Sequence, residues 1–317
     1  MPMDPSILRK ATPVQLAFLL LAVILVAAVI INPGFASAGA VRAQLSIGAV
    51  IGTVAIGQTI LIISGQIDLS IPWAMTAAGM TMSALHGSGY GDMLCIAAAL
   101  GVGLLIGVCN TIGVALFRVQ SLVWTLAMNT LVQGLVLVIT SSQPPKGGVP
   151  ATIRTLAVGT VAGLPWAGLL WGVLAILTII TMRRTVLGRV IYATGINPIA
   201  TFFSGIDVRR TYLFGFVLSS FCAALGGALL TGYTSEAYLG MGDDYMLLPI
   251  AAVVIGGTSI LGGSGSYLGT IAGVLIMLIL QSTLSLIQIA QGGREIILGL
   301  LILATIVAYG RRDALRA

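Results

Sequence analysis

The sequence predicts an all-α protein that crosses a membrane many times, and three observations support this fold class. Hydrophobic residues make up 58% of the 317 residues, charged residues make up 8%, and the mean hydropathy is +1.09. An ordinary soluble domain carries charge on about a quarter of its residues. The few charges also lie far apart, and the gaps between them reach the roughly 20 apolar residues that a spanning helix needs. A water-soluble globule is therefore excluded.

Charge-free stretches predict about ten spans in one transmembrane domain that covers residues 1–317. They are 11–41, 43–67, 69–91, 93–117, 119–145, 155–182, 211–235, two spans within 245–293, and a shorter last run at 296–309. We expect broken helices near 64–72 and near 256–265, where polar residues or pairs of glycines interrupt the apolar sequence. In transporters such interruptions often line a cavity.

The basic residues predict the orientation, because short loops rich in Lys and Arg stay in the cytoplasm. With the N-terminus inside, all 15 basic residues except Arg42, Lys146, Arg154 and Arg294 fall on the cytoplasmic side. We therefore expect both termini, and the polar insertion 183–210, in the cytoplasm. A cleaved secretory signal is disfavoured, since the apolar run 14–31 is longer than a usual signal core.

The residues that most enzymes and metal sites need are scarce. The chain has one histidine, His86, and its two lysines, Lys10 and Lys146, lie outside any Gly-x-x-x-x-Gly-Lys-Ser/Thr phosphate-binding loop. The three cysteines lie in apolar runs without a His or Cys at metal-ligand spacing. We therefore expect a chain that is no enzyme, holds no metal or other cofactor, and does not hydrolyse nucleotide by itself.

The insertion 183–210 contains a short predicted helix. Asn197 followed by Pro198 predicts a helix N-terminus, and Gly205 predicts its end, so the helix should run from Pro198 to about Ser204. It is either a docking element for another protein or a plain interfacial helix, because Ile199, Phe202 and Phe203 give it an apolar face.

This insertion resembles the cytoplasmic loop of the permease subunits of bacterial ABC importers for monosaccharides, the ribose permease family. The matching positions are Gly188, Arg189, Tyr192, Ala193, Gly195, Asn197, Ala200, Ser204, Gly205 and Ile206, with Thr201 where the family usually has a second Ala. The resemblance implies that the loop docks on a separate ATPase subunit and couples to it through Arg189, Tyr192, Gly195, Asn197, Ala200, Ser204 and Gly205.

Other segments extend the resemblance over most of the chain. The run 65–70 is similar to the family's G-x-I-D-L-S-V-G, and the glycines between 256 and 273 are similar to its G-G-x-x-x-x-G-G-x-G-S-x-x-G-x-x-x-G. Gly107, Asn110, Gly113 and Thr125 fit further family elements. The chain departs from the family pattern at 71–73 and 127–129. These positions lie near the expected substrate pathway, so the departures affect the identity of the solute more than the expected fold.

The resemblance also implies the setting of the protein. It implies a multi-pass protein of the bacterial inner membrane that pairs with an identical or different second permease. ATP and Mg would be bound by the ATPase subunits, a solute-binding protein would deliver the solute outside, and no nucleic acid would be involved. The outer charges Glu236, Asp243 and Asp244 are candidates for docking the solute-binding protein, or are ordinary solvated loop charges.

Polar residues inside the spans are the candidates for the substrate pathway: Gln58, Gln66, Asp68, Ser70, Asn110, Thr125, Asn129, Gln133, Ser219, Ser220, Gln281 and Ser282. Asp68 is the most unusual, because a carboxylate at the bilayer centre costs about 2.5 to 3.5 kcal/mol on insertion scales. Alternatively, Asp68 or Ser70 caps the next helix, and the other polar residues form interhelical hydrogen bonds. The spacing of Gly265, Gly269 and Gly273 predicts close helix packing.

The predicted function is that of a permease subunit of an ATP-driven importer for a monosaccharide or similar neutral polar solute. A permease for branched-chain amino acids or nucleosides is the nearest alternative. An ion-coupled secondary transporter would need acidic or His residues inside the spans, and only Asp68 is near one. A membrane scaffold without transport activity is the remaining alternative.

Overall fold

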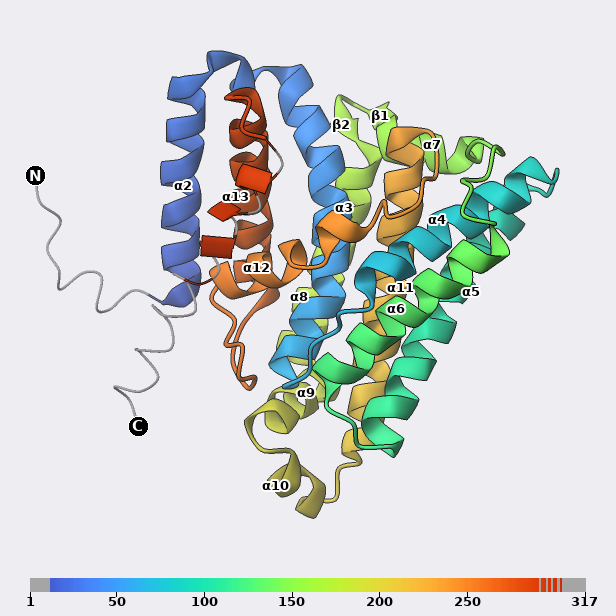
Figure 1. Ribbon diagram of the computed structural model, residues 1–317. Helices are drawn as coiled ribbons and strands as arrows, with labels where there is room; N and C mark the ends of the chain where they lie inside the picture. Colours follow the sequence, from blue (N-terminus) through green and yellow to red (C-terminus); the bar gives the residue numbers. More distant parts are fainter. Residues whose placement is uncertain (1–11, 291, 295, 298, 301–302, 304–317) are drawn as a thin grey trace, which may run out of the picture.

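The computed structural model describes residues 12–290, 292–294, 296–297, 299–300 and 303. The first half holds helices α2 (Pro13–Ile31), α3 (Ala38–Ile63), α4 (Ile71–Gly87), α5 (Asp92–Thr111) and α6 (Ser121–Ile139), with a 3₁₀ turn at Pro33–Ala36 and a π-helical turn at Ile112–Leu116. The second half holds α7 (Ala151–Val158), α8 (Trp166–Arg184), α9 (Val186–Ile196), α10 (Pro198–Phe203), α11 (Val208–Thr234), a 3₁₀ turn at Asp243–Tyr245, α12 (Leu248–Ile255) and α13 (Tyr267–Leu286). A small antiparallel hairpin, β1 (Thr160–Val161) and β2 (Leu164–Pro165), pairs Thr160 with Pro165 between α7 and α8 (Figure 1).

Seven helices of the described chain are long and apolar enough to cross a membrane: α2, α3, α5 with its π-helical turn, α6, α8, α11 and α13. Helix α4 has 17 residues and α12 has 8. At about 1.5 Å per residue, α12 is roughly 12 Å long and covers less than half of a hydrocarbon core of about 30 Å. The stretch 245–293 thus contributes one long helix and one half-helix, and most of the predicted run 296–309 lies outside the described residues.

The core lies around the two longest helices, α3 and α11. Helix α11 packs against α3, α4 and α5, and α3 also contacts α8, α12 and α13. A Cβ atom added at Gly57 of α3 would collide with the backbone of Ser219 on α11, so the two backbones are in direct contact there. Helix α2, in contrast, is mostly exposed and packs on α13 at the edge of the molecule (Figure 1).

Both predicted breaks are present, and they lie side by side. Residues 64–70 connect α3 to α4, and residues 256–266 connect α12 to α13. The backbone N–H of Gly263 in the second break donates a hydrogen bond of 2.8 Å to the carbonyl oxygen of Ile63 at the end of α3. The second break therefore supplies a partner for one of the terminal carbonyls of α3.

The helix start after the first break differs from the expected cap. Ser70 is the N-cap residue of α4, and Pro72 lies in the first turn, but the side chain of Ser70 accepts no hydrogen bond from that turn. Asp68 does not cap the turn either, because its Oδ1 accepts from the backbone N–H of Ser70, which precedes the helix. The carboxylate therefore shapes the break, and neither Asp68 nor Ser70 caps the first turn of α4.

Candidate functional site

A buried polar cluster is centred on Asp68. The carboxylate is fully buried and accepts hydrogen bonds from the backbone N–H of Ser70 at 2.9 Å, from Ser70 Oγ at 2.6 Å and from Ser219 Oγ on α11 at 2.9 Å. Asn110 Nδ2 on α5 donates to Ser70 Oγ at 2.8 Å. These three hydrogen bonds satisfy polar atoms whose burial would otherwise be costly. The cluster thereby connects α5, the first break and α11.

Helix α6 supplies hydrogen bonds to the first break and to the start of α4. Ser121 Oγ accepts from the N–H of Ile67 at 3.3 Å, Thr125 Oγ1 from the N–H of Leu69 at 2.9 Å, and Asn129 Oδ1 from the N–H of Trp73 at 3.2 Å. These three acceptors recur every four residues, so they lie on one face of α6. We call this set the α6 ladder. It pairs backbone N–H groups that the break between helices leaves without helical partners.

The remaining predicted pathway residues differ in their surroundings. Gln58 on α3 is fully buried, and neither polar atom of its side chain has a hydrogen-bond partner among the described residues. Gln133 continues the stripe of the α6 ladder by one turn and is half-buried. Gln66 is half-buried in the first break. The structure thus groups Asp68, Ser70 and Asn110 in one cluster, and Thr125 and Asn129 in the ladder beside it.

A cavity of 1160 Å³ lies between the first break and the insertion 183–210. Gln66, Ser121 and Tyr212 contribute polar groups to its wall, and Phe202 and Phe203 of α10 contribute aromatic ones. Its volume slightly exceeds the range of about 300 to 1,000 Å³ for small-molecule sites. Of the predicted pathway residues, Gln66 therefore borders open space beside α10.

Helix α9 contacts both breaks in what we call the coupling junction, formed by Ile63, Tyr192, Gly195, Gly263 and Gly265. The hydroxyl of Tyr192 donates a hydrogen bond of 2.8 Å to the carbonyl oxygen of Gly265. Burial raises the pKa of this hydroxyl above its ordinary value, so it remains a protonated donor. A Cβ atom at Gly195 would collide with the carbonyl oxygen of Ile63 and lie 2.6 Å from the N–H nitrogen of Gly263. Only glycine fits there.

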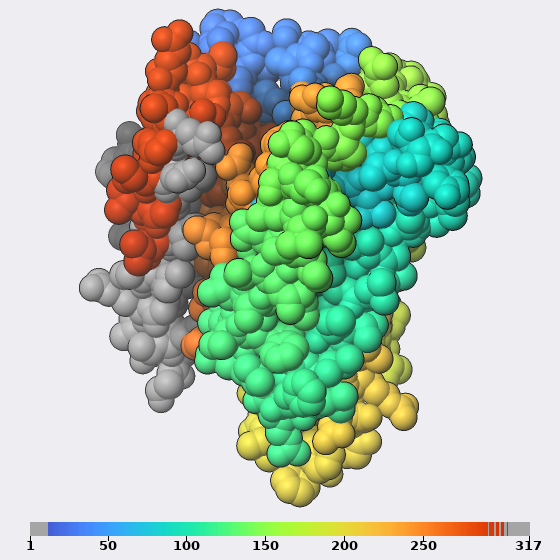
Figure 2. All heavy atoms as spheres, turned by 45° about the vertical axis from the view of Figure 1, so that its right-hand side comes forward, coloured from blue at the N-terminus to red at the C-terminus, as the bar shows by residue number. Residues whose placement is uncertain are grey.

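Helix α10 follows the predicted local pattern. Asn197 Oδ1 accepts a hydrogen bond of 3.0 Å from the N–H of Ala200, Pro198 occupies the first turn, and Gly205 has a φ of +81° after the helix end. The side chains of Phe202 and Phe203 are 63% and 82% exposed. This segment forms the lower tip of the molecule (yellow in Figure 2). Two exposed aromatic rings on a protruding helix make an apolar contact surface.

The other predicted coupling residues surround this helix. Arg189 on α9 is exposed, as are Ala200 and Ser204 on and after α10. Asn197, Ala200 and Ser204 line a cavity of 280 Å³ between α9 and α10. Tyr192 and Gly195, in contrast, lie on the side of α9 that contacts the coupling junction.

The glycines of the predicted packing motif have two different roles. Gly269 and Gly273 lie on α13 against α12, where an added Cβ would collide with the carbonyl oxygens of Gly256 and Ala252. Gly265 precedes α13 and has a φ of +146°, so it belongs to the break and not to a helix interface. The even spacing of the three glycines therefore does not correspond to one continuous helical stripe.

Ser121 was missing from the predicted set, and Ser219 was predicted without its partner. Ser219 on α11 gives Asp68 its donor from another helix, and Ser121 begins the α6 ladder. Ser121 had a usable signal, because it precedes Thr125 by four residues, as Thr125 precedes Asn129. Ser219 was a predicted candidate as a polar residue inside a span, but its contact with Asp68 was not predicted, because it joins positions 151 residues apart.

The family described as branched-chain amino acid transport system / permease component matches residues 41–306, which include both breaks, the α6 ladder and the coupling junction. The chain belongs to this family. The permease is 32% identical to the ribose import permease protein of Haemophilus influenzae over 297 residues, which cover 93% of this chain and 92% of that protein. It is 31% identical to the ribose import permease protein of Escherichia coli K12 over 85% of this chain and 84% of that protein.

A further relative is the fructose import permease protein of Bifidobacterium longum, with 32% identity over 73% of this chain and 66% of that protein. No solved structure matches the chain. The predicted family resemblance is thus confirmed, and the permease is a multi-pass protein of the inner membrane.

Proposed function

We propose that this permease is the membrane subunit of an ATP-binding cassette importer and that its solute is a monosaccharide or a similar neutral polar molecule. The observation that carries the proposal is the coupling junction, because it connects the insertion 183–210 directly to both broken helices. Similarity to permeases named for ribose and fructose supports a sugar. Uncharged amide and hydroxyl groups along the breaks suit a solute that offers hydroxyl groups.

The proposed coupling mechanism runs from α10 to the breaks. An ATPase subunit would bind the exposed aromatic rings of α10, and its movement on ATP binding would shift α9, which is covalently continuous with α10. Tyr192 and Gly195 would transmit that shift to the two breaks, since packed backbones move as units. The cavity lined by Gln66 would then be where the solute leaves the permease.

The proposed topology has ten spans with both termini in the cytoplasm. The end of α5, the end of α8 and the start of α11 all lie at the end of the molecule that carries α9 and α10 (Figure 1). These helix ends bear Arg118, Arg183, Arg184, Arg209 and Arg210. Their common position supports a cytoplasmic location for this end by the positive-inside rule.

The proposed assembly contains two permeases, identical or different, two ATPase subunits and an outer solute-binding protein. The whole chain would act as one permease domain without a cofactor of its own, and ATP and Mg would be bound by the ATPase subunits. A test is to purify the permease with its ATPase and solute-binding partners, reconstitute them in vesicles, and measure ATP-dependent uptake of labelled monosaccharides. Phe203→Asp, which places a charge on the proposed docking surface, is expected to abolish copurification of the ATPase.

Tyr90→Asp provides a matched control, because Tyr90 is an exposed aromatic residue in the connection from α4 to α5, which lies at the opposite end of the structure from α10 (Figure 1). This variant should keep the ATPase bound. Uptake driven by a proton or sodium gradient without ATP would contradict the importer assignment. Uptake of branched-chain amino acids or nucleosides in place of sugars would keep the ABC importer and reject the sugar.

A further inference from the structure

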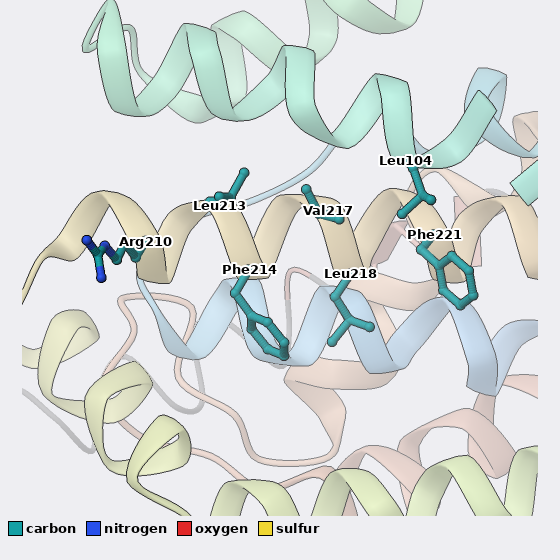
Figure 3. Close-up of a pocket in the computed structure, with 7 residues that line it drawn as sticks. All are labelled: Leu104, Arg210, Leu213, Phe214, Val217, Leu218 and Phe221. Atoms are coloured by element: carbon teal, nitrogen blue, oxygen red, sulfur yellow. The ribbon is translucent and has the colours of Figure 1, made fainter. Parts of the chain in front are cut away.

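A furrow runs along the outer face of α11 (Figure 3). Its walls are Leu213, Phe214, Val217, Leu218 and Phe221 of α11 together with Leu104 of α5, and its volume is 450 Å³. The α11 residues recur at intervals of three and four, so they form one continuous stripe on the helix. Leu104 and Leu213 are about two-fifths exposed (41% and 43%), as is Val108 on the neighbouring face of α5. In a membrane this surface faces lipid or another helix.

One charged residue lies at the end of this apolar furrow. Arg210 belongs to the first turn of α11, and Figure 3 shows it at the opposite end of the furrow from Phe221. Its side chain is 87% exposed, and its Nε forms an ion pair with Asp207 at 3.3 Å. A guanidinium has five N–H donors, so four donors on the two terminal nitrogens remain outside this ion pair. The apolar furrow thus ends at a cation.

We propose that the furrow is a binding site for an anionic phospholipid, with one acyl chain along the α11 stripe and the phosphate bound by Arg210. The distance along α11 from Arg210 to Phe221 is about 16 Å at 1.5 Å per residue, which matches one leaflet of a hydrocarbon core of about 30 Å. Basic residues at the mouth of grooves between transmembrane helices bind anionic headgroups. The apolar wall accepts any acyl chain, whereas Arg210 selects a negatively charged headgroup.

The binding itself needs only a membrane, so it holds whether or not the proposed transport function is correct. The leaflet depends on the proposed orientation, in which Arg210 lies on the cytoplasmic side. Helix α11 also contributes Ser219 to the buried cluster and begins directly after the insertion 183–210. A lipid bound along its outer face would therefore contact the same helix that carries the Asp68 partner.

The test uses the full-length permease in vesicles of phosphatidylcholine that contain phosphatidylglycerol with a photoactivatable acyl chain. After illumination, mass spectrometry of peptides locates the labelled residues. We expect adducts on Leu104 and on the stripe from Leu213 to Phe221, and about fivefold less labelling in Arg210→Gln, because one basic residue near an anionic surface contributes roughly that factor. Arg184→Gln is the matched control, since Arg184 is exposed in the last turn of α8 outside the furrow, and it should leave this labelling unchanged.

Three results would overturn the proposal. Equal labelling of the furrow by photoactivatable phosphatidylcholine, or unchanged labelling in Arg210→Gln, would show that Arg210 does not select an anionic lipid. Efficient disulfide formation between two copies of Leu213→Cys, in a Cys109→Ser background that removes the exposed native thiol, would instead assign the furrow to a contact between permeases. Neither measurement depends on transport activity.

Discussion

The hydroxyl of Tyr192 donates a hydrogen bond of 2.8 Å to the carbonyl oxygen of Gly265, a residue 73 positions further along the chain. Tyr192 belongs to the insertion next to α10, and Gly265 belongs to the break between α12 and α13. The same break donates from Gly263 to Ile63, the last residue of α3. The proposed ATPase-docking segment and the two broken helices therefore form one connected unit.

Removing this hydrogen bond should weaken coupling more than folding. In Tyr192→Phe the ring keeps its packing, and the net loss is about 1 kcal/mol, the usual contribution of one hydrogen bond. We expect ATP-dependent uptake to fall several-fold while solute-stimulated ATP hydrolysis persists, because α10 still docks. Tyr90→Phe is the control, since Tyr90 is exposed far from the junction and should behave as the native chain. Equal loss of uptake and hydrolysis would contradict a role for Tyr192 in coupling alone.

A methyl group at the coupling junction should have a larger effect. Gly195→Ala places a Cβ against the carbonyl oxygen of Ile63, so α9 must move away from both breaks. Overpacking of this kind typically costs about 1 to 3 kcal/mol. Gly172→Ala on α8 is a matched control, because it also lies in a helix and its Cβ would meet open space. Thermal unfolding in detergent and ATP-dependent uptake should both decrease in Gly195→Ala only.

The stability of the fold should depend strongly on the hydrogen-bond acceptors of the Asp68 side chain. Asp68→Leu leaves the N–H of Ser70 and the hydroxyls of Ser70 and Ser219 without their acceptor. Each buried unsatisfied group costs about 1 to 3 kcal/mol, so most of this variant should fail to accumulate in the membrane. Asp68→Asn retains one carbonyl oxygen and should accumulate at an intermediate level. Similar membrane levels of the two variants, measured by immunoblot, would argue against the acceptor role.

The α6 ladder predicts a difference between two threonines of the same helix. Thr125→Val keeps the side-chain shape but removes the acceptor of the Leu69 N–H, which should cost about 1 to 3 kcal/mol. Thr130→Val removes only a local bond from an exposed hydroxyl to the carbonyl of Leu126 and should be nearly neutral. The thermal midpoint in lipid nanodiscs distinguishes the two, and equal midpoints would mean that the ladder does not stabilise the break.

The local features of the site could be predicted because they depend on residues close in sequence. Asn197, Pro198 and Gly205 determine the start and end of α10 through capping and backbone freedom, and the structure agrees at each position. The two breaks were predicted for the same reason. The half-helix α12 was not, because an apolar run shows its own length but not where tertiary contacts end a helix.

Composition and charge spacing by themselves determined that the chain is a polytopic membrane protein, because apolar segments of this length are stable only in lipid. The sequence pattern also identified Asp68 as an unusual charge within a span, and the insertion 183–210 as the segment that resembles the family most closely. Only the tertiary structure decided that Ser219 partners Asp68, that α6 supports the first break, and that α9 contacts both breaks. These relationships join residues 54 to 151 positions apart, and long-range pairing is set by how helices pack and not by local preference.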